Sequence, residues 1–307
     1  MAYTHRHALV VMLLVGAVHL AGAQPADTVI TGATVLVRFD AARALSVDPA
    51  GRLYVVDVGR DAVLQLGPDG TRLAILGGPG TEDGQFDEPA DVDPTNGLLW
   101  VVADAGNSRL QRFSHTFLHL ETLPVSRIVR FTPGAQGRTV PVGAERGDGA
   151  ADGRPIAVVV SSTSEIFAID ETQGLVLKWD ASRRLERPIG GYNAGEGALV
   201  DPVALAADAT SLYVADRGRD AVLVYDLFGG YIRTLAAGRA ADVRALAVVR
   251  DQLWIVLPER LLVYQTRGRL LRVLDVRLGE PLVDVAHHKD LTYLLTPTRL
   301  LRVDTLR

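Results

Sequence analysis

The chain has 307 residues, of which 48% are hydrophobic and 22% charged, so it can bury a sizeable core and is not expected to be disordered. Its net charge of −4 gives no general attraction to nucleic acid or to an anionic membrane surface. The absence of cysteine excludes disulfides, thiolate metal sites and cysteine nucleophiles.

The N-terminus is typical of an export signal. The basic start His5-Arg6-His7 precedes an apolar run that ends at Ala21-Gly22-Ala23, whose small residues suit cleavage. The run is too short, and too interrupted by Gly16 and His19, to favour a permanent membrane span. We therefore expect residues 1–23 to be a signal peptide and the mature protein to be periplasmic or secreted; a retained anchor is the alternative. A lipid anchor is excluded, because the cleavage site has no cysteine.

Two segments of the chain are nearly the same. Leu53–Leu66 reads LYVVDVGRDAVLQL and Leu212–Tyr225 reads LYVADRGRDAVLVY, with ten of fourteen positions identical and an offset of 159 residues between equivalent positions. A match of this quality within one chain indicates a repeat architecture.

Each repeat predicts four short strands: the first often follows a proline, the second often ends in an aspartate, and tight turns join the rest. Successive units lie about 47 residues apart, which suits a four-stranded propeller blade. Six units can be recognised: Ala44–Leu76, Ala90–Leu123, Ile156–Pro188, Val203–Leu235, Arg244–Leu274 and Val283–Val303. The fold class is therefore all-β, a six-bladed propeller within a single domain of residues 24–307.

Two units are irregular. The fourth strand of the third unit, near Arg184–Pro188, is poorly defined, and the last unit ends after three strands. Thr34–Phe39 alternates like a strand and has no unit of its own, so we expect it to complete the last blade and close the ring.

The second strands share a large aromatic residue. We expect these side chains to pack between neighbouring blades rather than to stack on a ligand. They are Tyr54, Trp100, Phe167, Tyr213, Trp254 and Tyr293. Trp100 lies one residue out of step, which a β-bulge would explain.

One segment departs from the period. The aspartates Asp104 and Asp170 are 66 residues apart, against 47 and 46 for the neighbouring intervals. The extra length falls at about residues 124–155, a stretch rich in arginine and glycine. It is a solvated loop or, alternatively, a lid or docking element.

The second unit resembles the NHL repeat. The motif WVVADAGNSRLQRF, from Trp100 to Phe113, and the preceding Gly77–Pro94, with its Asp-Gly-Gln-Phe and a following proline, carry the resemblance. The first and fourth units match well except for arginine in place of Asn107, and the others match by period and apolar pattern. The resemblance implies a six-bladed β-propeller and little about chemistry, because propellers of this kind include binders and enzymes.

Turns after the second strands repeat an Asp-x-Gly pattern. We expect Asp57, Asp104 and Asp216 to accept backbone N–H bonds in these turns and the glycines to take positive φ. Polar side chains in the same region would gather on one rim, where we favour salt bridges with acidic neighbours; a binding surface for an anionic or sugar-like ligand is the alternative. These candidate ligand-binding residues are Arg60, Asn107, Arg109, Arg217 and Arg219.

A catalytic or metal centre would have to form near the ring axis. Asp91 and Asp284 lie in first strands, and Asp48, Asp93 and Asp208 end them. Such carboxylates could hold calcium or another hard cation, but turn capping is the interpretation we favour. No HExxH spacing and no Gly-x-Ser-x-Gly elbow occurs. We therefore name no catalytic residue, leave the metal ligands open and predict no cofactor.

The functional hypothesis from the sequence is an exported monomeric propeller that acts as a binding or scaffold module for a protein or glycan partner in the cell envelope. Neither nucleic acid nor a stable membrane span is expected. The alternative is a metal-dependent propeller enzyme of the lactonase or lyase type, with carboxylates near the central channel. Convergence of three or more Asp, Glu, Asn or His side chains on one point of the axis would favour the enzyme; a channel lined by alanine, valine and leucine would count against it.

Overall fold

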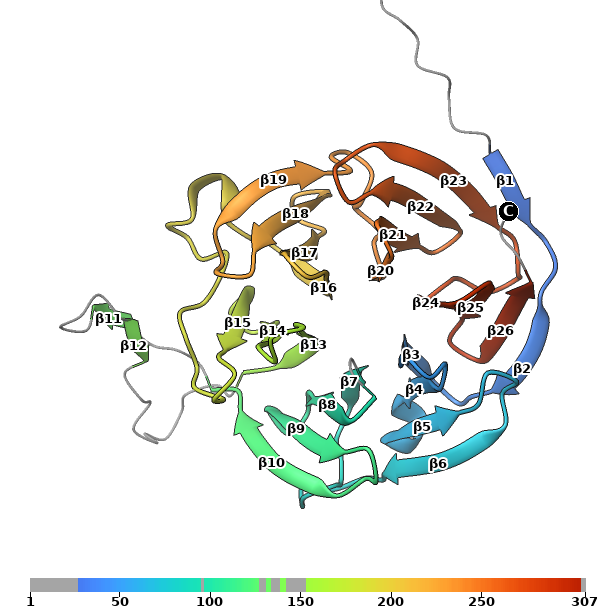
Figure 1. Cartoon of the computed structure of the whole chain (residues 1–307), viewed down its shortest axis with the longest axis horizontal. Helices are drawn as coiled ribbons and strands as arrows, with labels where there is room; N and C mark the ends of the chain where they lie inside the picture. Colours follow the sequence, from blue (N-terminus) through green and yellow to red (C-terminus); the bar gives the residue numbers. More distant parts are fainter. Residues whose placement is uncertain (1–26, 95–96, 127–130, 134–138, 142–152, 305–307) are drawn as a thin grey trace, which may run out of the picture.

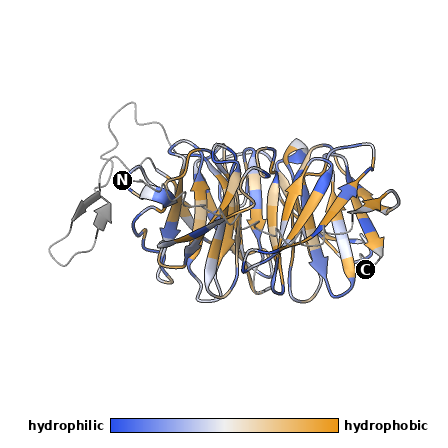
Figure 2. Cartoon of the chain, turned by 90° about the horizontal axis from the view of Figure 1, so that it is seen from above, coloured by the Kyte–Doolittle hydropathy of each residue, from blue (hydrophilic) through white to orange (hydrophobic). Residues whose placement is uncertain are grey.

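The computed structural model describes residues 27–94, 97–126, 131–133, 139–141 and 153–304. They form a ring of six β-sheets around a central axis, which is a six-bladed β-propeller as predicted (Figure 1). Seen edge-on, the ring is a flat disc with apolar residues along the strands and polar residues toward both faces (Figure 2). The expected signal peptide lies outside the described residues, and no helix among the latter is long and apolar enough to cross a membrane.

The first strand of each blade lies nearest the axis, and the second lies directly outside it. The innermost strands are β3 (Ala42–Val47), β7 (Pro89–Asp93), β13 (Pro155–Val160), β16 (Pro202–Ala207), β20 (Ala245–Val249) and β24 (Asp284–His288). The second strands are β4 (Leu53–Asp57), β8 (Leu99–Asp104), β14 (Ile166–Asp170), β17 (Ser211–Asp216), β21 (Gln252–Leu257) and β25 (Leu291–Leu295). Antiparallel pairing of the two sets brings the start of each first strand beside the end of its second strand.

The third and fourth strands form the periphery. The third strands are β5 (Ala62–Leu66), β9 (Arg109–Ser114), β15 (Leu175–Trp179), β18 (Ala221–Asp226), β22 (Arg260–Gln265) and β26 (Arg299–Asp304). The outer strands are β6 (Arg72–Gly77), β10 (His119–Pro124), β19 (Tyr231–Leu235) and β23 (Leu270–Val276). In blade three, isolated bridges to Leu185 and Ile189 stand where a fourth strand would lie.

The N-terminal segment completes the ring. β2 (Thr34–Arg38) pairs antiparallel with β26 and so supplies the fourth strand of blade six, as the alternation of Thr34–Phe39 predicts. The preceding β1 (Asp27–Ile30) pairs parallel with β23 and adds a fifth strand to blade five, a feature the sequence pattern did not predict. The chain therefore joins its first and last blades by hydrogen bonds.

Four short elements lie outside the blade pattern. Within the insertion, β11 (Phe131–Pro133) and β12 (Thr139–Pro141) pair with each other as an antiparallel hairpin. The remainder of its arginine- and glycine-rich part lies largely outside the described residues, so its role stays a prediction. The two 3₁₀ turns are η1 (Val58–Arg60) and η2 (Gly195–Gly197).

The core is divided among the interfaces between blades. One cluster of buried apolar side chains lies between each pair of neighbouring blades. The six predicted aromatics belong to these interfaces and are at most 2% exposed. Trp100 is out of step because it faces the preceding blade, where its ring meets Tyr54 at 4.9 Å between centroids; the pairing of β8 with β9 has no bulge. The predicted packing role is thus observed, and the proposed bulge is wrong.

Candidate active site in the central channel

The aspartates of the Asp-x-Gly turns fasten neighbouring loops. Asp57 accepts a hydrogen bond from the backbone N–H of Ala41 at 3.0 Å, and Asp104 accepts one from Asp87 at 2.8 Å. Asp216 accepts N–H bonds from Val200 and Asp201, in the loop that enters β16. All three aspartates are fully buried. They join the end of a second strand to the segment before the first strand of the same blade, and Asp216 also accepts the N–H of Arg219 at 3.0 Å within its own turn, as expected.

The glycines of these turns serve close packing. Gly59, Gly106 and Gly218 do not have positive φ, so that expectation is wrong; positive φ falls two residues later, at Asp61 (46°) and at the equivalent residues of the other turns. A Cβ on Gly106 would lie 2.6 Å from the Asp87 carboxyl and 2.8 Å from its backbone oxygen. The pattern requires glycine because the entry loop passes directly over the turn.

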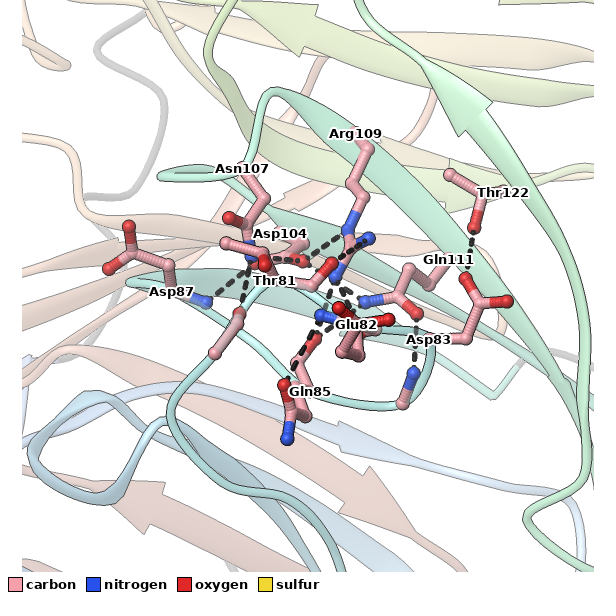
Figure 3. A network of polar contacts seen from close by, with 12 residues as sticks. Thr81, Glu82, Asp83, Gln85, Asp87, Asp104, Asn107, Arg109, Gln111 and Thr122 are labelled. Atoms are coloured by element: carbon pink, nitrogen blue, oxygen red, sulfur yellow. Dashed lines mark hydrogen bonds and ion pairs between the residues drawn. The ribbon is translucent and has the colours of Figure 1, made fainter.

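Most of the candidate rim residues bind loops of the protein itself. Figure 3 shows the network around Asp104, which also accepts hydrogen bonds from Asn107 and Arg109. The Arg109 guanidinium donates further to the carbonyl oxygens of Thr81, Glu82 and Gln85. The hydrogen-bonding groups of Asn107 and Arg109 are therefore largely occupied by Asp104 and by the loop between blades one and two.

Arg60 and Arg219 act in a similar way, and Arg217 donates its Nε–H to the Val243 carbonyl at 3.1 Å. Arg60 pairs with Asp57 at 2.8 Å and Asp40 at 3.0 Å, and Arg219 donates to the backbone oxygens of Ala198 and Glu196. Arg217 alone of the five candidates lines the central channel. The structure therefore does not bring the five residues together into one site.

The channel on the axis is a cavity of about 560 Å³ lined by the six first strands. Its walls are mainly alanine, valine and leucine, and charged side chains interrupt them at a few places. The charged or ionisable residues that line it are Arg43, Asp91, Asp93, Glu171, Arg217, Arg244, Asp284 and His287. The channel therefore meets neither expectation in full, because its walls are largely apolar and yet several charged side chains line it.

Strand register shows that Asp91 and Asp284 occupy equivalent positions. Asp91 pairs with Ala103, the residue before Asp104 at the end of β8. Asp284 pairs with Leu295, the last residue of β25. The other four blades place alanine at this level: Ala44, Ala157, Ala204 and Ala245. Small side chains fit a crowded axis, so two carboxyl groups in this ring depart from what packing favours.

Both carboxyl groups hold the next blade. The Asp91 carboxyl accepts a 2.8 Å bond from the N–H of Val158 in β13, and the Asp284 carboxyl accepts a 2.7 Å bond from Leu45 in β3. These N–H groups belong to inner edge strands, which have no further strand to pair with. The carboxyls therefore satisfy backbone donors that would otherwise face the channel.

Burial dominates the protonation of the two carboxyls. It raises the pKa of Asp91 to about 7, although two backbone N–H bonds and Arg43 act in the opposite direction. Burial also raises the pKa of Asp284 well above its usual range, and the Asp91 carboxyl adds to this rise. A carboxyl with a pKa near neutrality can give or take a proton at physiological pH, as acid–base catalysis requires.

One mouth of the channel is lined mainly by cations. Arg43 precedes Ala44 in β3 and Arg244 directly precedes Ala245, so both lie next to the level of Asp91 and Asp284. Arg217 and Glu171 follow the ends of β17 and β14, which lie at the same mouth. The wider rim is more mixed, since Glu88 and Glu171 are both bound by Arg154.

The other end of the channel carries different groups. Asp93 is equivalent to Ser46, and its carboxyl accepts the N–H of Val160 at 2.7 Å. His287 lies within hydrogen-bond distance of Thr292, with 3.0 Å between ring nitrogen and hydroxyl oxygen, and burial lowers its pKa. These side chains bind neighbouring strands and do not gather around a common point with Asp91.

The residues of the channel do not fit a protein-bound metal ion. In the part of the chain that the structure describes, no three His, Asp or Glu side chains converge as a metal site would require. Both oxygens of Asp91 and of Asp284 already accept backbone N–H groups. The sequence predicts no cofactor, and the alternative of calcium binding stays untested.

Some of these channel residues could have been found from the sequence. Asp91 and Asp284 stood out because they occupy first strands otherwise rich in alanine. Arg43 and Arg244 were missed as site residues. Their position directly before Ala44 and Ala245 was the available signal, but only the structure shows that they line the channel.

Comparison with known proteins supports the fold. No family model and no curated protein matches the chain, so membership of the NHL family is not established. Among solved structures, a streptogramin B lyase shares 8% identity and a TM-score of 0.60, over 88% of this chain and 96% of its own. A catalytically inactive virginiamycin B lyase from Staphylococcus aureus with quinupristin shares 8% identity and a TM-score of 0.59, over 88% of this chain and 97% of its own. A gluconolactonase from Xanthomonas campestris shares 15% identity and a TM-score of 0.61, over 88% of this chain and 88% of its own.

These similarities correct the functional hypothesis. At such low identity they establish the six-bladed propeller fold alone, yet these three structures, similar over most of the chain, are named as enzymes. The preference for a binding or scaffold module is therefore overturned. The scaffold hypothesis rested on the absence of a recognisable catalytic motif. Carboxyls from distant parts of the sequence that meet only in the closed ring leave no local motif.

Proposed function

We propose that the protein is an enzyme of the lactonase or lyase type that opens a cyclic ester in the central channel. The observation that carries this proposal is the pair Asp91 and Asp284, two carboxyls with raised pKa in a ring otherwise made of alanine. The names of the similar propeller enzymes supply the reaction class. The metal-dependent form of this alternative is not part of the proposal.

The two carboxyls provide an acid and a base. When one is ionised and the other protonated, the ionised group can remove a proton while the neutral group can donate one. In hydrolysis, water attacks the ester carbonyl, its proton passes to the ionised carboxylate, and the leaving ring oxygen takes the proton of the neutral carboxyl. In elimination, the ionised carboxylate removes a proton from the carbon next to the one that bears the ester oxygen; a C=C bond forms as the C–O bond breaks.

Enclosure strengthens this chemistry. The reacting groups lie in a channel with mostly apolar walls, where charges interact more strongly than in water. A cavity of about 560 Å³ is within the range of small-molecule sites in proteins. Backbone N–H donors fix the orientation of both carboxyls, so little reorganisation is needed when a substrate enters.

Turnover of cyclic esters by the purified protein tests the proposal. Sugar lactones and cyclic depsipeptides are incubated with wild type, Asp91→Asn, Asp284→Asn and the surface control Asp69→Asn. Mass spectrometry separates the reactions, because hydrolysis adds one water and elimination leaves the mass unchanged. We expect turnover by wild type and control and a loss of at least about a hundredfold in each channel variant. Absence of turnover of any cyclic ester, or wild-type rates in both channel variants, would contradict the proposal.

We further infer that the protein is exported, as its N-terminal sequence indicates, and that it works as a monomer. The protein or glycan partner expected from the sequence belonged to the scaffold hypothesis and is not retained. Mass spectrometry of the secreted or periplasmic protein would give the first residue of the mature chain. Light scattering would give its oligomeric state.

A further inference from the structure

We propose that the substrate is anionic: a cyclic ester that carries an oxyanion, a carboxylate or a phosphate, which Arg43 binds at the mouth of the channel. The part of this inference that makes the substrate an ester rests on the proposed function. Recognition of the oxyanion itself follows from the arginines alone and can be measured without turnover.

Arg43 is a half-buried cation that lacks a close partner. None of the described residues makes a hydrogen bond with its guanidinium or an ion pair within 4.0 Å, although the group lines the channel. Burial is the largest of the effects that lower the pKa of Arg43, which means that the charge is held away from water without full compensation. A ligand anion would supply the missing partner.

The acidic groups nearest to Arg43 are already engaged. Glu88 and Glu171 both interact with Arg43 at longer range, but Arg154 binds them at 2.7 Å and 3.0 Å. Asp91 also acts on Arg43, yet its pKa of about 7 leaves that carboxyl largely protonated below neutrality. The arrangement thus keeps the Arg43 fork available to a planar or tetrahedral oxyanion.

Two further arginines strengthen the positive potential at this mouth. Arg244 from blade five lines the same cavity, as does Arg217 from blade four. Arg217 donates its Nε–H to the Val243 carbonyl at 3.1 Å, which leaves its terminal N–H groups for a ligand. Arg244 is exposed and makes no ion pair with a residue of the described ranges. Three cations from three blades surround an opening to which Glu171 contributes the opposing charge.

The position of Arg43 relative to Asp91 gives the substrate a direction. Arg43 precedes Ala44, and Ala44 shares the level of Asp91 and Asp284. The Arg43 charge and the Asp91 carboxyl also act on each other's pKa, so an anion bound by Arg43 would lie near the Asp91 carboxyl. The oxyanion is therefore expected at the mouth and the ester deeper in the channel.

Calorimetric binding of two unreactive probes tests this inference. Gluconate presents a carboxylate and inorganic phosphate presents a tetrahedral oxyanion, so the two titrations separate the sources of the charge. The proteins are wild type, Arg43→Gln, Arg43→Lys and the matched control Arg72→Gln, in which an exposed arginine of β6 is changed. Circular dichroism verifies that each variant is folded.

We expect wild type and control to bind at least one probe, Arg43→Gln to bind it about tenfold or more weakly, and Arg43→Lys to lie between them. Wild type that binds neither probe, or Arg43→Gln that binds as tightly as wild type, would overturn the inference. Asp91→Asn should retain binding, since it removes a proposed catalytic group and leaves Arg43 in place. Binding that depends on Arg43 in a protein without turnover would reject the proposed function and support the anion site.

Discussion

Asp91 and Asp284 lie at the same level of the channel, on blades two and six, with blade one between them. Each carboxyl holds an inner strand of the next blade, and the Asp91 carboxyl helps to raise the pKa of Asp284. They are 193 residues apart in the sequence, so only closure of the ring brings them together. Carboxyls that interact lose their protons in two steps, and the singly protonated form is the one that offers an acid and a base.

The first prediction concerns the pH dependence of turnover. The rate should rise with pH as the first carboxyl of the pair ionises and fall as the second loses its proton, giving a bell-shaped profile. The pKa of about 7 for Asp91 places one limb near neutrality. Initial rates between pH 4 and pH 10 measure the profile. A rate that does not change between pH 5 and pH 9 would be inconsistent with acid–base roles for this pair.

The second prediction concerns stability. Asp91 has a raised pKa in the folded protein, so the folded state holds more protons than the unfolded chain between the unfolded pKa near 4 and the folded pKa near 7. Its contribution to stability is therefore fully present below pH 4 and is lost as pH rises through 7.

Asp91→Asn should flatten this part of the pH dependence, because the amide cannot ionise. Urea unfolding of wild type, Asp91→Asn and Asp69→Asn at pH 5, 6, 7 and 8 measures it, and Asp69→Asn should keep the wild-type slope in this window. Asp69 is exposed and hydrogen bonds lower its pKa, so its own contribution falls at more acidic pH. Parallel curves for wild type and Asp91→Asn would refute the prediction.

The repeat predicted the fold because each blade encodes its own strands. The Leu53–Leu66 and Leu212–Tyr225 copies contain the second and third strands of blades one and four, and the unpaired Thr34–Phe39 predicted the closing strand. The sequence did not predict β1. Its residues pair with the outer edge of blade five, and nothing local to them signals that partner.

The candidate site was harder to predict than the fold. Arg109 lies five residues after Asp104 and binds three carbonyl oxygens of an inter-blade loop, whereas Arg217 directly follows Asp216 and lines the channel. The repeat pattern places both near the same rim and does not show which of them reaches the axis. Arg43 was missed because its register relative to Asp91 follows from an irregularity in the pairing of β3 with β4.

The third prediction concerns the turn glycines. Gly106→Ala should destabilise the protein by about 2 kcal/mol or more, because the added Cβ would lie 2.6 Å from the Asp87 carboxyl and 2.8 Å from its backbone oxygen. Gly32→Ala is the matched control, since nothing lies within 4 Å of its Cβ position and its φ is not positive. Denaturant unfolding of both variants measures the difference. If the two variants have the same free energy of unfolding, the loop before β7 moves to accept the added Cβ at no cost in stability, which would contradict the prediction.

The fourth prediction concerns closure of the ring. Deletion of residues 1–38 removes β2, which leaves β26 as an unpaired edge and uncovers part of the core between blades six and one. We expect this variant to lose its cooperative thermal transition or to aggregate. Deletion of residues 1–31 removes β1 but keeps β2, so it should retain a cooperative transition with a smaller loss of stability.

Thermal unfolding and size-exclusion chromatography compare the two truncations with the mature chain. The shorter deletion is the control, because both variants lack the N-terminal segment and differ only in residues 32–38. If both truncations unfold alike, β2 contributes no more than β1, and pairing of β2 with β26 cannot be what holds the first and last blades together. If only the longer deletion fails, closure depends on the four residue pairs between β2 and β26.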